Sequence, residues 1–368
     1  MSKPTLQQIQ GAIQNQGAKW TPGVTSVSEL SEDQQNLRLG LDIPKGERGR
    51  VKLALAQEQP PEFVFARERD WRNKDGENWV SDIQDQGNCG SCVAFATVAT
   101  LESQAKIQVN KPSYPFDLAE ADLFFCGAGR KCSEGWWPAE ALKYAKEKGV
   151  PRETCFPYQD QDLNCTPCDD RQNHLLKIGK WQELINITQR KEWLDKQGPL
   201  VACMAVYRDF FYYKDGVYKH VNGDLAGYHA VACIGYSESE QCWICKNSWD
   251  SDWGNKGFFK IAYGEAEMDT GFAMYGVGEL TGPLIDEAQE EEEEQKKGWA
   301  KYAVVEQSLL PEDKASVFWA YVEDKWRYQP MSEEQLATLN PTLCAADSLQ
   351  VIYQGEQIVK IQTWKQFS

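Results

Sequence analysis

Long apolar runs are missing from this chain of 368 residues. No run of about 18 apolar residues occurs, so no segment is expected to cross a bilayer as a helix. Residues 1–8 also lack the apolar core of a secretory signal. We therefore expect a cytoplasmic protein if the sequence is complete, and an extracytoplasmic or lysosome-like protein if it has been trimmed.

Positive charge and histidine are both in short supply. The net charge is −16, which argues against nucleic acid or an anionic membrane as the main partner. Of the three histidines, His174 and His220 stand in no motif. Cys242 and Cys245 are spaced like a zinc-binding pair, but no second such pair lies near them, so we expect no metal and no cofactor.

Apolar and aromatic residues are present at the levels of ordinary globular proteins, 42% and 12%. The chain is too long for one ordinary compact domain, so two or more units are expected. The oligomeric state is left open.

A first chemical motif lies at residues 86–96, where Gln86 and a glycine-bearing turn precede Cys92. Apolar residues at helical spacing follow, which predicts that Cys92 stands in the first turn of a helix, with Ser91 as a possible cap. The positive end of a helix dipole favours thiolate over thiol, so we expect a depressed thiol pKa.

Two further motifs lie far downstream. His229 begins a strand-like apolar run, and Asn247 stands beside Trp249. His229 follows Cys92 by 137 positions (229 − 92) and Asn247 follows it by 155 (247 − 92). This order and spacing are typical of peptidases that use a cysteine, a histidine and an asparagine, in which the separation is about 130–150 residues.

Residues 62–280 closely resemble the papain and cathepsin cysteine peptidases in these three blocks. The resemblance implies a papain-like α+β fold of two lobes, a helical lobe over 62–180 and a β-rich, barrel-like lobe over 181–280. It implies an endopeptidase acting on polypeptides. A peptide ligase or dedicated processing protease of the same fold, and a catalytically silent binding scaffold, are the alternatives.

The resemblance also implies catalytic roles. Cys92 would be the nucleophile, His229 the base and later the acid, Asn247 the residue that orients the imidazole, and Gln86 a donor to the oxyanion.

Substrate binding is expected at Gly135, Gly227, Tyr228, Trp249 and Tyr275. Trp249 would shield the contact between the histidine and the asparagine from water. Gly135 stands in a turn whose backbone would pair with substrate.

Disulfides are also implied by the resemblance, Cys89 with Cys132, and Cys126 with Cys165 or a neighbour. The remaining strand cysteines are expected to be buried free thiols.

Four divisions of the chain follow. Residues 1–61 resemble the short propeptide of cathepsin B-type zymogens, which crosses the cleft in reverse, although an unrelated helical adaptor is the alternative. The peptidase domain would span 62–283. The acidic stretch 284–298 is expected to be an extended linker, and 299–368 a small β-rich accessory domain.

Tyr275 should close the bottom of the specificity pocket and favour small or apolar side chains in it. Fluorogenic peptides varied at the residue that enters this pocket test the prediction through their relative kcat/KM. A strict preference for basic side chains would contradict it.

Overall fold

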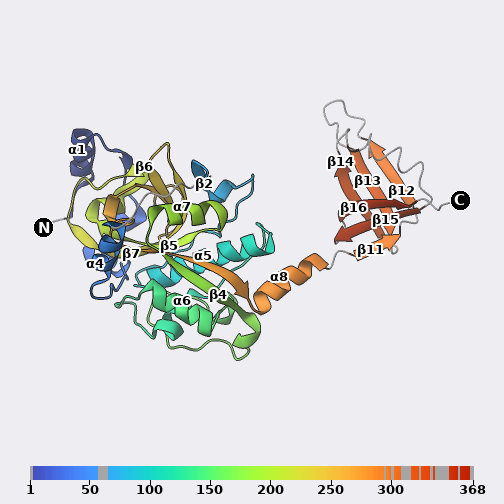
Figure 1. The fold of residues 1–368 in the computed structure, drawn as a ribbon, viewed down its shortest axis with the longest axis horizontal. Helices are drawn as coiled ribbons and strands as arrows, with labels where there is room; N and C mark the ends of the chain where they lie inside the picture. Colours follow the sequence, from blue (N-terminus) through green and yellow to red (C-terminus); the bar gives the residue numbers. More distant parts are fainter. Residues whose placement is uncertain are drawn as a thin grey trace. The chain divides into compact units, whose positions relative to one another are not determined.

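The computed structural model describes residues 3–56 and 65–293 and, nearer the C-terminus, 296–299, 302–307, 316–322, 325–331, 335, 348–354 and 357–364. It divides into two compact units, Met1–Asp286 and Glu287–Ser368 (Figure 1). Within these ranges no helix is both long and apolar enough to cross a membrane.

The helices are α1 (Leu6–Gln16), α2 (Ser26–Glu29), α3 (Glu32–Leu37), α4 (Glu47–Ala56), α5 (Cys92–Val109), α6 (Pro138–Glu147), α7 (Ile187–Lys196) and α8 (Pro283–Glu293). Short 3₁₀ turns occupy Trp71–Asn73, Glu153–Cys155, Arg171–His174, Arg208–Tyr212 and Glu265–Glu267, and a π-helical stretch occupies Asp122–Ala128.

A ten-stranded sheet forms the centre of the first unit. Its order is β1-β6-β9-β8-β7-β5-β10-β4-β3, with β2 paired to β7. The strands are β1 (Lys19–Pro22), β2 (Glu68–Asp70), β3 (Val150–Pro151), β4 (Leu175–Leu184), β5 (Leu200–Tyr207), β6 (Tyr213–Tyr218), β7 (Leu225–Ser237), β8 (Cys242–Lys246), β9 (Phe258–Ala262) and β10 (Met274–Thr281).

Helix α5 is the spine of the helical lobe. Nearly all of its side chains are buried, because it lies between α6 and strands β5, β7 and β10 (Figure 1). Helix α6 begins at Pro138, where the sequence pattern predicts a helix, and it buries Ala141, Leu142 and Ala145 on one face. The predicted two-lobe α+β fold is confirmed.

The described part of the N-terminal segment, residues 3–56, is built into the first unit. Helix α1 begins with a capping box between Thr5 and Gln8 and ends at Gly17 in the left-handed conformation. Strand β1 extends the sheet by pairing with β6, and the Trp20 indole donates a 2.9 Å hydrogen bond to the Lys219 carbonyl. The sequence did not predict β1 or α4.

The second unit is a six-stranded sheet in the order β11-β15-β16-β14-β13-β12. Its strands are β11 (Lys296–Trp299), β12 (Tyr302–Gln307), β13 (Ser316–Val322), β14 (Lys325–Met331), β15 (Ser348–Gln354) and β16 (Gln357–Trp364). Strand β13 forms an antiparallel hairpin with β14, and β15 forms one with β16, as the alternation of aromatic and polar residues in these stretches predicts. The stretch from Ser332, whose pattern predicts a short helix, lies outside the described residues except for position 335.

The acidic stretch that was expected to be extended begins as helix α8. Leu284, Ile285 and Ala288 are buried along one side of it, and glutamate has a good helix propensity. Apolar anchoring on one face therefore outweighs the mutual repulsion of the carboxylates. Strand β11 also falls inside the predicted linker, because its residues pair with β15.

Charged groups are buried where α5 meets β8. Lys246 donates to the Ser81 hydroxyl (2.9 Å) and the Asp82 carbonyl (2.6 Å), and Glu102 accepts the Leu118 N–H (2.8 Å). Burial raises the pKa of Glu102 from 4.5 to about 7, although the charge of Lys246 and the Ser81 hydroxyl act the other way.

Stability of the first unit should therefore fall as the pH rises from about 4.5 to about 7. Across this window the unfolded chain loses the Glu102 proton while the folded chain keeps it, so the loss approaches about 3 kcal/mol. Urea midpoints at pH 4.5, 5.5 and 7 should show a shallower decline in Glu102→Gln than in wild type. The exposed Glu147→Gln is the control, and equal slopes in all three proteins would contradict the assignment.

Candidate active site

Cys92 is the first residue of α5, as predicted, and follows the loop 86–91. The loop passes close to the turn at 132–135, because a Cβ on Gly90 would lie 2.3 Å from the Glu134 carbonyl oxygen. Only glycine permits this approach. The loop thereby presents Cys92 at the point where the two lobes meet.

Ser91 does not cap α5, so that prediction is wrong. Its φ and ψ of −90° and 11° are not the extended backbone that turns a side chain onto the first N–H groups of a helix. The Ser91 hydroxyl lies instead 2.8 Å from the phenol oxygen of Tyr158. That phenol donates to the Gln86 carbonyl (2.8 Å), so Tyr158 joins the two ends of the loop.

His229 lies on β7 and Asn247 directly follows β8. The Nε2 atom of His229 lies 2.8 Å from Oδ1 of Asn247, and both side chains are buried. The ring of Trp249 covers the histidine at a centroid distance of 4.8 Å. Nδ1 of His229 makes no hydrogen bond of good geometry, although the backbone of Arg38 interacts with the imidazole and acts to raise its pKa, so Nδ1 is the nitrogen left for proton transfer.

Strand β7 packs against helix α5, and this packing brings Cys92 and His229 together. The backbone N–H of Ala230, the residue after His229, interacts with the Cys92 thiol and lowers its pKa. Two residues 137 positions apart in the sequence therefore occupy one site.

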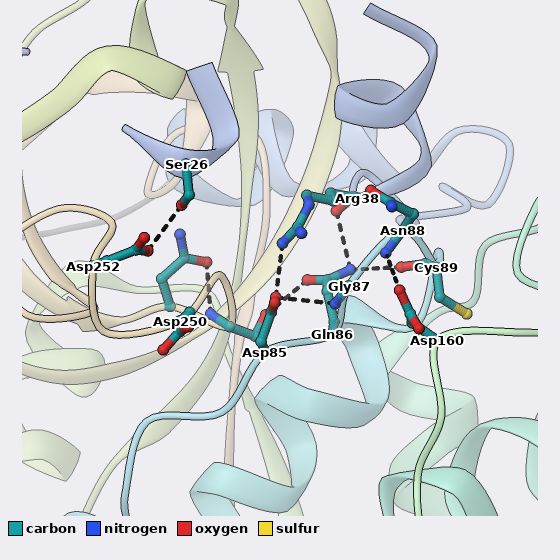
Figure 2. Close-up of polar contacts among 12 residues, drawn as sticks. Ser26, Arg38, Asp85, Gln86, Gly87, Asn88, Cys89, Asp160, Asp250 and Asp252 are labelled. Atoms are coloured by element: carbon teal, nitrogen blue, oxygen red, sulfur yellow. Dashed lines mark hydrogen bonds and ion pairs between the residues drawn. The ribbon is translucent and has the colours of Figure 1, made fainter. Parts of the chain in front are cut away.

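The side-chain amide of Gln86 is held on both sides. Its Oε1 accepts a hydrogen bond from Ser248 (2.7 Å), and its Nε2 donates to the carbonyls of Cys89 (2.7 Å) and Arg38 (3.2 Å), the latter two shown in Figure 2. Gln86 thus presents an oriented N–H, and the Arg38 carbonyl of the chain itself already occupies it.

Burial is the largest influence on the pKa values of Cys92 and His229. Burial raises the pKa of the Cys92 thiol to about 11, against the backbone N–H groups of Ala230 and Gly40, which lower it. Burial also lowers the pKa of His229 to about 4. The expected depressed thiol pKa is therefore wrong for this closed form, because the covering segment removes the water that would solvate a thiolate and an imidazolium.

The cleft segment, residues 38–42, provides that cover. It runs parallel to the turn at Trp136, whose N–H donates to the Gly40 carbonyl (2.9 Å) and whose carbonyl accepts the Asp42 N–H (3.0 Å). The N–H of Leu41 donates to the Tyr228 carbonyl (3.3 Å). The segment therefore bonds to both lobes across the cleft.

Ion pairs fasten the N-terminal segment on either side of the cleft segment. Arg38 pairs with Asp85 at 2.7 Å, Arg48 pairs with Glu267, and Arg50 pairs with Glu183. Ser26 also donates to Asp252 at 2.8 Å, as Figure 2 shows.

The structure places the residues expected to bind substrate as follows. A Cβ on Gly135 would lie 2.7 Å from the Gly40 carbonyl oxygen, and one on Gly227 would lie 3.0 Å from the Leu39 side chain. Gly135, Gly227 and Tyr228 therefore line the path of the cleft segment. Tyr275 is buried with its ring against Trp137 and Trp181, so its place in the specificity pocket stays a prediction.

Trp136 was not foreseen. The backbone that pairs with the cleft segment belongs to Trp136, one position after Gly135, for which backbone pairing was expected.

Three disulfides brace the helical lobe. Cys89 is bonded to Cys132, Cys126 to Cys165 and Cys155 to Cys168. The third pair was not predicted. The free cysteines Cys92, Cys203, Cys233, Cys242 and Cys245 are all buried.

A cysteine on a helix tip, a histidine held by an asparagine, and an amide beside them, set between two lobes, define a cysteine peptidase. Comparison with known proteins agrees. The family model described as papain family cysteine protease matches residues 65–277. The chain therefore belongs to the papain family of cysteine proteases and is a cysteine-type peptidase.

The chain is similar in sequence to cathepsins, and its fold is similar to that of solved proenzymes. It is 28% identical over 268 residues to Cathepsin B-like CP2 of Giardia intestinalis, covering 68% of this chain and 87% of the relative. It is 34% identical over 210 residues to Pro-cathepsin H of Bos taurus, covering 53% and 59%.

The structure of proCathepsin B S9 from Trypanosoma congolense shares the fold, with a TM-score of 0.61, 24% identity, and coverage of 76% of this chain and 100% of that one.

Gly40→Ala should weaken the closure of the cleft. A Cβ there would lie 1.8 Å from the Gly90 carbonyl oxygen, an overlap that must push the cleft segment away. The unprocessed variant should hydrolyse a fluorogenic peptide at least about tenfold faster than unprocessed wild type. Gly11→Ala, where the added Cβ meets nothing within 4 Å, is the control. A Gly40→Ala protein as inactive as wild type would contradict the argument.

Proposed function

We propose that this chain is the latent form of a cysteine endopeptidase whose own N-terminal segment fills the substrate cleft. One observation carries the proposal. The backbone of Gly40 lies on the Cys92 thiol, and the carbonyl of Arg38 lies on the Gln86 amide, where a substrate carbonyl would be polarised.

Four residues would carry out hydrolysis once the segment leaves. His229 takes the thiol proton at Nδ1, and the Cys92 thiolate attacks the substrate carbonyl carbon. The Gln86 amide and the Cys92 N–H bind the oxyanion. His229 then protonates the leaving amine, and water hydrolyses the acyl-enzyme. Asn247 keeps Nε2 of the imidazole turned away from the sulfur without adding charge.

Two features keep the chain latent, namely the direction of the cleft segment and the removal of water from around Cys92 and His229. The cleft segment runs parallel to the turn at Trp136, the reverse course that the family resemblance implied for a propeptide. In addition, a buried thiol with a raised pKa and a buried imidazole with a lowered one disfavour the charged pair that attacks. Trp249 would shield the histidine and asparagine in both forms.

Internal cleavage is favoured over removal of C-terminal residues. An enzyme that binds a substrate's terminal carboxylate needs a cationic side chain beside the cleft. The disulfide-tied stretch 156–168 carries aspartates at 160 and 162 and no lysine, arginine or histidine. Protein substrates, and no nucleic acid, are the partners that we propose besides the N-terminal segment.

Release would require a cut within 45–61, and the part inside α4 would have to unfold first. We keep 62–283 as the peptidase domain, 284–298 as the connection and 299–368 as an accessory domain. Three disulfides favour an oxidising compartment over the cytoplasm. The alternatives of a ligase and of a silent scaffold have no observation in their favour.

Labelling of the active site distinguishes a latent peptidase from a catalytically silent scaffold. A thiol-reactive peptide epoxide should label the full chain weakly and the same chain strongly after proteolysis within 45–61, because only then can it reach Cys92. Cys92→Ala should not be labelled in either state. Equal labelling before and after processing would contradict the propeptide role, and none after processing would favour the scaffold.

A further inference from the structure

Asp85 stands immediately before the oxyanion residue Gln86, and nothing in the mechanism uses it. Its side chain is 40% exposed even in the closed chain. Oδ1 accepts the N–H of Gly87 (3.0 Å), so the carboxylate is held in a fixed orientation. In the closed chain Oδ1 of Asp85 also accepts a hydrogen bond from Nη1 of Arg38 (2.7 Å), a contact drawn in Figure 2.

Asp85 lies on the side of the cleft that receives the leaving group. The leaving amine must meet His229, whose ring is covered by Trp249. Asp85 pairs with the backbone of Trp249 through an isolated antiparallel bridge. The opposite arm of the cleft is the turn at Trp136, which bonds to residues 40 and 42 of the cleft segment.

The position of Arg38 shows that a single side chain can connect the oxyanion site to Asp85. Its carbonyl accepts from the Gln86 amide at 3.2 Å, while its guanidinium reaches Asp85 with only 9% of the side chain exposed. A basic side chain within a residue or two of a carbonyl in this site can therefore span the same distance.

The surroundings of Asp85 favour a cation. Asp250 is exposed, and its N–H donates to the carbonyl of Gln84, the residue before Asp85 (3.3 Å). Asp252 is exposed further along the same loop, where its carbonyl accepts from Lys214 instead. Asp85 has Arg38 as its ion-pair partner. When the N-terminal segment departs, the partner of Asp85 departs with it.

We propose that Asp85 binds an arginine or lysine side chain at the first or second residue after the scissile bond, so that the enzyme selects polypeptides that are basic there. This inference rests on the proposed function. A fixed carboxylate and a guanidinium form a charge-assisted hydrogen bond, and a lysine would pair with the same carboxylate as a point charge. Arg38 would hold the same site in the latent chain.

The experiment uses the full chain, folded and then processed within 45–61, with active sites counted by epoxide titration. Internally quenched peptides share one acyl half and carry arginine, lysine, alanine or glutamate at the first or second position after the scissile bond. Wild type should cleave the arginine peptides about fivefold faster than the alanine peptides in kcat/KM, and the glutamate peptides more slowly.

The ratio of arginine to alanine rates should fall to about one in Asp85→Asn, because the charge on the site is gone. Asp85→Arg should invert it in favour of glutamate. Asp252→Asn removes an exposed carboxylate from the loop of Asp250 and should keep the wild-type ratio. Raising the salt concentration should lower the wild-type preference, because a partly exposed ion pair is screened.

An unchanged ratio in Asp85→Asn, or a ratio of one in wild type, would overturn the assignment of Asp85 and leave the peptidase intact. If processed wild type hydrolysed no peptide and took no label at Cys92, both the assignment and the proposed function would fall. Since ratios are taken per active site, a variant that folds in low yield still gives an answer.

Discussion

Close contact between the Gly40 backbone and the Cys92 thiol is the constraint on which the closed structure depends. It requires glycine at three positions, because Cβ atoms on Gly40, Gly90 and Gly135 would each meet a carbonyl oxygen at 2.7 Å or less. The same contact excludes water, and this exclusion keeps the thiol and the imidazole of His229 neutral. Steric fit and electrostatics thus maintain latency through a single feature.

Gln86 connects this contact to the rest of the helical lobe. Its amide binds the cleft segment, its carbonyl accepts from Tyr158, and its Oε1 accepts from Ser248 of the opposite lobe. The stretch that carries Tyr158 is itself tied down by disulfides at Cys155 and Cys165. A donor aimed at a developing charge must not move during the reaction, and these contacts supply that rigidity.

Local patterns predicted the elements that local forces determine. The start of α5 at Cys92, α6 with its apolar face, and both hairpins of the second unit follow from periodicity and turn residues. Patterns failed where a distant partner decided the outcome. Tyr158 draws Ser91 away from capping, and burial of one face folds the acidic stretch into α8.

The sequence by itself determined the family and singled out the four residues proposed for the site, because the chemistry of peptide hydrolysis demands those residue types with their flanking glycines and tryptophans. Only the tertiary structure decided the protonation of the site, the pairing of Trp136 with the cleft segment and the seating of Arg38 on Asp85. Each of these depends on which groups lie opposite one another across the cleft and exclude water there. Local sequence does not specify those contacts.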